Sequence, residues 1–125
     1  MTDLAGRRIL VVEDEMLIAL LIESLLKEMG CAVSIASGLD EALAVIQADP
    51  HGFDAVTLNL GLNGKKADEL AALLQARTTP FIVVTGYTEP RVLDRFAGQP
   101  VVSKPLVPQQ LEAALRQAIR DAGHI

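Results

Sequence analysis

Polar residues that suit metal and phosphoryl chemistry follow several short apolar runs in this sequence. Five such residues come directly after four different runs: Glu13, Asp14, Asn59, Thr85 and Lys104. Neighbouring carboxylates suit a hard divalent cation such as Mg²⁺, which prefers one or two carboxylates together with water and phosphate oxygens. A lysine and a hydroxyl group can hold the remaining oxygens of a phosphoryl group. These residue types predict a site for a phosphoryl group if the fold brings them together.

The elements that must position these residues alternate along the chain. Short runs rich in β-branched residues predict strands at 8–12, 32–36, 54–58, 80–84 and 100–103. Helical patterns lie between and after them, at 15–30, 37–49, 67–76, near Pro90 and at 106–123. Strict alternation of strand and helix indicates βα units and a parallel sheet.

The first two expected helices carry signals for their ends and their buried faces. In the first helix an apolar stripe is expected to face the core: Ile18, Leu21, Ile22, Leu25 and Met29. Leu17 and Leu20 then remain beside this stripe, near the surface. Gly30 is expected to end this helix, and Ser37 to act as the N-cap of the next one.

Right-handed crossovers place such a chain in a doubly wound sheet of order 2-1-3-4-5, a flavodoxin-like α/β sandwich of three layers. Ligands of these sheets bind beyond the carboxyl ends of the strands, at the switch point between strands 1 and 3. The five polar residues follow strands and are therefore expected to meet at one edge of the sheet.

Composition bounds the class of protein. The 125 residues predict a single domain over 1–125 with no output domain, and half of them are hydrophobic. The net charge is −5 and the basic residues are scattered, so no nucleic-acid-binding surface is expected. A single cysteine excludes an internal disulfide, and no signal peptide or apolar run long enough to span a membrane is present. A soluble cytoplasmic domain is expected.

Four motifs in order resemble the receiver domains of two-component response regulators. They are ILVVEDE (9–15), DAVTLNLGLNG (54–64), IVVTGY (82–87) and VVSKP (101–105). Each is weak alone, but together they span about 100 residues in the family's order and spacing. The second half, with PFIVVTGY and SKP, also resembles single-domain bacterial receivers common in alphaproteobacteria.

The resemblance implies a role for each residue at the strand ends. The implied Mg²⁺ ligands are Glu13, Asp14, Asn59 and the backbone carbonyl of Gly61. Thr85 is implied as the switch hydroxyl and Lys104 as the contact to the phosphoryl group, followed by Pro105 after a cis peptide bond. The chain departs from the family at Val101, where an aromatic residue usually pairs with the switch hydroxyl.

Asn59 occupies the position at which receivers accept a phosphoryl group on an aspartate. An amide oxygen carries no formal charge and does not give a stable acyl phosphate, so Asn59 is not expected to be phosphorylated. Loss of the third carboxylate is also expected to weaken Mg²⁺ binding. Three interpretations stay open: a natural degenerate (pseudo-)receiver, an ordinary Mg²⁺-dependent receiver that carries an Asp-to-Asn change, and a phosphoacceptor moved to Thr57, Thr85 or Ser103. Thr57 is expected to point away from the pocket.

The expected function is signalling by protein contacts, not enzyme catalysis. Partners implied by the resemblance are a histidine kinase, a phosphotransfer protein or another signalling protein, with a homodimer through the face from strand 4 to helix 5. The residues expected at these surfaces are Leu17, Leu20, Tyr87, Arg91, Arg95 and Leu106. The rival interpretation is a small phosphate- or nucleotide-binding enzyme, against which the sequence has no GxGxxG motif after strand 1 and no P-loop.

Overall fold

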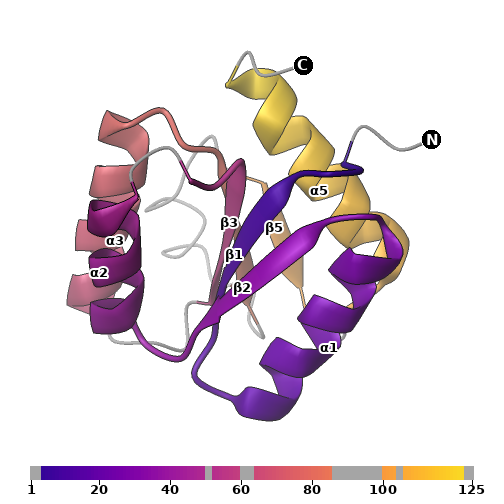
Figure 1. Ribbon diagram of the computed structural model, residues 1–125, viewed down its shortest axis with the longest axis horizontal. Coiled ribbons are helices and arrows are strands. Elements are labelled where there is room, and N and C mark those ends of the chain that lie inside the picture. The colour runs from indigo at the N-terminus through magenta and orange to yellow at the C-terminus, as the bar shows by residue number, and fades with distance from the viewer. Residues whose placement is uncertain (1–3, 50–51, 60–63, 86–99, 104–105, 123–125) are drawn as a thin grey trace.

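Five parallel strands form one sheet in the order β2-β1-β3-β4-β5 (Figure 1). The computed structural model describes residues 4–49, 52–59, 64–85, 100–103 and 106–122. The strands are β1 (Arg8–Val12), β2 (Ala32–Ala36), β3 (Ala55–Asn59), β4 (Phe81–Thr85) and β5 (Val101–Ser103). The helices within these residues are α1 (Met16–Glu28), α2 (Leu39–Ala48), α3 (Gly64–Ala76) and α5 (Pro108–Asp121). The predicted doubly wound, flavodoxin-like sheet is confirmed, and the helix expected near Pro90 lies outside the described residues.

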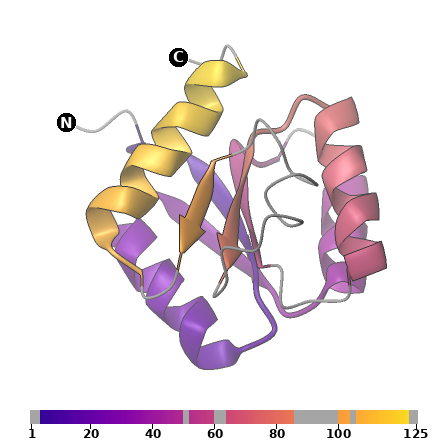
Figure 2. The same ribbon diagram turned by 180° about the vertical axis from the view of Figure 1, so that it is seen from behind.

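Helices cover both faces of the sheet and make three layers. α1 and α5 lie on one face, and α2 and α3 lie on the other (Figure 1, Figure 2). The alternation of side chains in β1 follows this division, because Ile9 and Val11 pack with α1 and α5 whereas Leu10 and Val12 pack with α2 and α3. The strand is buried on both faces, which explains why it is a continuous apolar run in the sequence. No helix in the described ranges is long and apolar enough to cross a membrane.

The end of α1 is as predicted, and four of the five residues of its predicted stripe pack against the core. Gly30 has a φ of +90° and its N–H donates to the carbonyl of Lys27 at 3.0 Å, as expected of a glycine after a helix end. The residues of α1 that are fully buried are Ala19, Ile22 and Leu26. The prediction of Leu21 in the core is wrong, since 46% of this residue is exposed. Apolar residues occupy more than one face of α1, so periodicity alone does not select the buried face.

The starts of α2 and α3 also differ from the prediction. The N-cap of α2 is Gly38, so the assignment of Ser37 as the N-cap is wrong. The Ser37 hydroxyl and N–H instead donate to Oε2 of Glu41, at 2.8 and 3.0 Å. α3 begins at Gly64, three residues earlier than expected, because Gly64 and the lysines after it give no start signal. β3 and β4 each end one residue later than expected, at Asn59 and Thr85.

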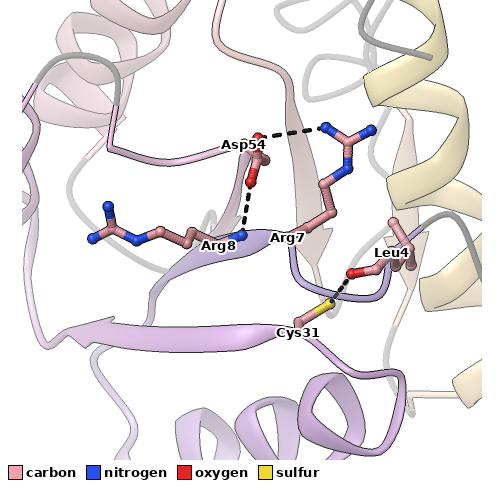
Figure 3. A network of polar contacts seen from close by, with 5 residues as sticks. All are labelled: Leu4, Arg7, Arg8, Cys31 and Asp54. Atoms are coloured by element: carbon pink, nitrogen blue, oxygen red, sulfur yellow. Dashed lines mark hydrogen bonds and ion pairs between the residues drawn. The ribbon is translucent and has the colours of Figure 1, made fainter.

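Polar contacts join the amino ends of β1 and β3 at the edge opposite the predicted site (Figure 3). Asp54 accepts a hydrogen bond from the N–H of Arg8 at 2.8 Å and pairs with the Arg7 guanidinium at 3.4 Å. Nearby, the Cys31 thiol donates to the carbonyl of Leu4, whose side chain is fully buried. Burial, and then the carboxylate of Asp54, raises the pKa of the Cys31 thiol. This edge therefore anchors the chain before β1, with no sign of a reactive thiol.

Candidate functional site

The carboxyl ends of the central strands lie side by side at one edge of the sheet. Val12 of β1 is in register with Leu58 of β3, which places the next residues, Glu13 and Asn59, beside each other. Asn59 is in register with Val84 of β4, so the backbone of Thr85 follows one residue beyond it. The structure therefore places Glu13 and Asn59 at the switch point between β1 and β3, as the sequence predicted.

Glu13 is a buried carboxylate with only 1% of the residue exposed. Its N–H continues the pairing with β2 by donating to the carbonyl of Ala36 at 3.1 Å. Its side chain turns back toward the start of α1, where Oε1 accepts a hydrogen bond from the N–H of Glu15 at 3.2 Å. Glu15 is the N-cap of α1, so this acid at the strand end also satisfies a donor at the helix start.

Asn59 is the last residue of β3 and is 5% exposed. Its side-chain Nδ2 donates a hydrogen bond to Oε2 of Glu13. Together with the N–H of Glu15, this contact means that each carboxylate oxygen of Glu13 accepts a hydrogen bond from the protein. The amide thus partners a buried carboxylate without adding charge, which satisfies the rule that buried polar groups are hydrogen-bonded.

The structure describes only some of the other predicted site residues. Asp14 is exposed, and α1 has no acid in its first turn. Thr85 is described by its backbone only, and the remaining predicted residues of the site and of the second partner surface lie outside the described residues: Gly61, Lys104, Pro105, Tyr87, Arg91 and Arg95. Val101 is partly buried against the core of α2 and α3, and Leu106 is partly buried against the core of α1 and α5.

A Mg²⁺ site requires several oxygen ligands that converge on one point. Among the described residues no group of three or more Asp, Glu, His or Cys side chains could hold a metal ion. Asn59 directs an N–H donor toward Glu13, so a cation between these two residues would have to displace that hydrogen bond. The side chains described at this edge therefore do not fit a Mg²⁺ site between Glu13 and Asn59.

Thr57 does not point away from the face that carries Asn59. Side chains two residues apart on a strand share a face, so Thr57 lies on the same face as Ala55 and Asn59, and the expectation of the opposite face is wrong. The residue is 1% exposed, and its hydroxyl has no hydrogen-bond partner within the described ranges. Burial, rather than direction, keeps this hydroxyl from a phosphoryl donor.

An exposed apolar patch covers the first two turns of α1, which begin next to the site. Its residues and their exposed fractions are Met16 at 55%, Leu17 at 81%, Leu20 at 46% and Leu21 at 46%. The sequence indicated Leu17 and Leu20 but missed Met16 and Leu21. The signal that could have found them is the excess of apolar residues in this helix over what one buried stripe requires.

Comparisons with known proteins agree with this arrangement. The sequence model of a family described as the response regulator receiver domain matches residues 9–116. The response regulator PhyR from Brucella abortus has 30% sequence identity and a TM-score of 0.78, with 95% of this chain and 50% of that chain covered. A PhyR variant from Bartonella quintana, described as an anti-anti-sigma factor, has 25% identity and a TM-score of 0.78, with 98% and 52% covered.

A third solved structure shows the fold alone. The chemotaxis protein CheY4 of Vibrio cholerae has 24% identity and a TM-score of 0.78, and 91% of this chain and 99% of that chain are covered. This chain spans about half the length of the two PhyR chains. A search of curated proteins found no match.

Proposed function

Because the chain belongs to the family of response regulator receiver domains, we propose that it is a receiver module that signals through protein contacts without accepting a phosphoryl group at Asn59. Receivers of this family are signalling modules of two-component systems, and the fold of this chain is theirs. The proposal concerns the mode of action: the site at the carboxyl edge works as a fixed part of the structure and not as a phosphoacceptor.

The observation that carries the proposal is the side chain of Asn59. A phosphoacceptor must attack phosphorus through a nucleophilic oxygen, and a carboxylate does so because it is charged. Asn59 is an uncharged amide, is 5% exposed, and donates its N–H to Glu13. Both the chemistry of the group and its hydrogen bond oppose attack on a phosphoryl donor.

We propose that the contacts are made with a histidine kinase, a phosphotransfer protein or another signalling protein. The exposed patch of α1, formed by Met16, Leu17, Leu20 and Leu21, supports this proposal because large apolar side chains gathered on one helix favour a protein partner. The similarity to PhyR supports it too, since the Bartonella protein is named for an action on another protein. The similarity to PhyR also favours the alphaproteobacterial subfamily of receivers.

We propose a homodimer through the face from β4 to α5 as a second protein contact. Light scattering would detect this dimer.

A second candidate is an ordinary Mg²⁺-dependent receiver in which an aspartate at position 59 has been changed to asparagine. The retention of the buried acid Glu13 beside Asn59 favours this candidate, because an intact acidic site would need only one carboxylate restored. An enzyme that acts on phosphate or nucleotides has less support, since the family to which the chain belongs consists of signalling modules.

Phosphorylation by a small-molecule donor separates these functions. The chain and its Asn59→Asp variant would be incubated with acetyl phosphate and Mg²⁺, and their intact masses compared. We expect an adduct of about 80 Da, one phosphoryl group, on the variant only. An adduct on the unchanged chain would contradict the proposal. No adduct on either protein would contradict the second candidate, because restoring the aspartate would then not restore an acceptor.

A further inference from the structure

The contact between Glu13 and Asn59 places a buried carboxylate beside an amide donor. Glu13 is 1% exposed and Asn59 is 5% exposed, so water has little access to the contact between them. A carboxylate in such a place is costly unless hydrogen-bond donors or a cation compensate for the lost hydration. Nδ2 of Asn59 and the N–H of Glu15 supply donors to the two carboxylate oxygens.

A carboxylate at position 59 would change this balance. An ionised aspartate is an acceptor only, so it would face the acceptor oxygen Oε2 of Glu13 with no proton between them. Two negative charges at contact distance in a buried place repel each other strongly. A divalent cation between them would remove that repulsion, because carboxylate oxygens are the ligands that Mg²⁺ prefers.

We infer that the amide of Asn59 takes the place of a divalent cation at the switch point between β1 and β3, and that the domain is therefore stable and ordered without Mg²⁺. The inference rests on the proposed function and deepens it by assigning how the site is regulated. A site held by an amide–carboxylate hydrogen bond has no exchangeable ion, so neither Mg²⁺ nor its removal changes its state.

Thermal unfolding in rising concentrations of MgCl₂, at constant ionic strength, tests the inference. We expect the Tm of the unchanged chain to be independent of Mg²⁺. The Asn59→Asp variant should have a lower Tm without Mg²⁺, and its Tm should rise and saturate as Mg²⁺ is added, because an ion that binds only the folded state stabilises it. Gln117→Glu is the matched control: it adds the same charge on an exposed turn of α5, and its Tm should not respond to Mg²⁺.

Calorimetric titration of Mg²⁺ into the unchanged chain keeps the inference testable if the Asn59→Asp variant does not fold. The expected result is no saturable heat. Saturable binding, or a Tm of the unchanged chain that rises and saturates with Mg²⁺, would overturn the inference.

The intact-mass measurement with acetyl phosphate separates a failure of this inference from a failure of the proposed function. Saturable Mg²⁺ binding without a phosphoryl adduct would overturn only the inference. An adduct without Mg²⁺ binding would overturn only the proposed function.

Discussion

At the scale of single residues, the side chain at position 59 decides which chemistry the carboxyl edge of the sheet can perform. An amide can donate a hydrogen bond to a neighbouring carboxylate, whereas an ionised carboxylate can only accept one. In this chain the amide of Asn59 donates to Glu13, which also accepts from the N–H of Glu15. The edge therefore keeps a buried acid and an ordered hydrogen-bond network, and it lacks a charged nucleophile at the end of β3.

Thr57 supplies a prediction at the same scale. Its buried hydroxyl has no partner in the part of the chain that is described, so the Thr57→Val variant should unfold at equal or higher denaturant concentration, with a gain of up to about 1 kcal/mol. Urea unfolding measures the difference. Thr57→Ser is the matched control, which keeps the hydroxyl, removes a buried methyl group and should destabilise the domain by about 1 kcal/mol. A clear loss of stability in Thr57→Val would contradict the assignment of an unpartnered hydroxyl.

The sequence predicted that Glu13 and Asn59 meet, but not how they interact. Their meeting follows from topology, because parallel strands bring their carboxyl ends to one edge. The direction of the Asn59 amide and the bond from the Glu15 N–H depend on side-chain geometry, which residue types and spacing do not encode. The error on Thr57 has a different cause, because the two-residue spacing does put Thr57 and Asn59 on the same face and the alternation was misapplied.

At the scale of elements, α1 joins the site to the exposed apolar patch that we propose as a docking surface. Its N-cap, Glu15, contacts Glu13, and its first two turns carry the exposed apolar patch. Its other face packs Ile22 and Leu26 into the core. One helix therefore carries two apolar faces with different roles, which is why the stripe read from the sequence was partly wrong.

Two leucines of α1 test the division between these faces. Leu26→Ala should cost about 2–5 kcal/mol of unfolding free energy, because Leu26 is fully buried and its truncation leaves a cavity. Leu17→Ala should change stability by no more than about 0.5 kcal/mol, since 81% of Leu17 is exposed. Both variants replace leucine with alanine, and these residues have similar helix propensities. The difference between their unfolding free energies therefore reports the difference in burial. Similar losses in the two variants would contradict the assignment of Leu17 to a free surface.

The start of α2 gives a prediction that depends on pH. The N–H of Ser37, and then its hydroxyl, lower the pKa of Glu41 by hydrogen bonding to its carboxylate. Because the folded pKa lies below the unfolded one, the stabilisation is present above the unfolded pKa and is lost as pH falls through the folded pKa. In Ser37→Ala the pKa of Glu41 should rise part of the way to its ordinary value, since the N–H remains.

Carboxyl-carbon NMR titration measures this pKa directly. Ser24→Ala is the control, because Ser24 is an exposed residue of α1 and its loss should leave Glu41 unchanged. An unchanged pKa of Glu41 in Ser37→Ala would show that the hydroxyl contributes nothing.

At the scale of the whole molecule, the alternation of strands and helices was sufficient to predict the sheet order. The strands at 8–12 and 32–36 were predicted to the residue, because each is a short apolar run next to a clear helix signal. The burial of Leu4 and the contacts of Asp54 were not predicted, since Leu4 precedes the first expected strand and no spacing pairs Asp54, expected to begin a strand, with Arg8. The sheet order therefore follows from patterns repeated along the chain. The contacts of Leu4 and Asp54 depend instead on single residues.

We propose that the state of this receiver depends on neither a phosphoryl donor nor Mg²⁺. The most direct measurement is a pair of ¹H–¹⁵N NMR spectra of the unchanged chain, one in buffer and one with acetyl phosphate and Mg²⁺. The predicted result is that the side-chain NH₂ signals of Asn59 and the backbone signals of Glu13 and Glu15 superimpose in the two spectra. A new set of signals for these residues that grows and saturates with the donor and Mg²⁺ would contradict the claim.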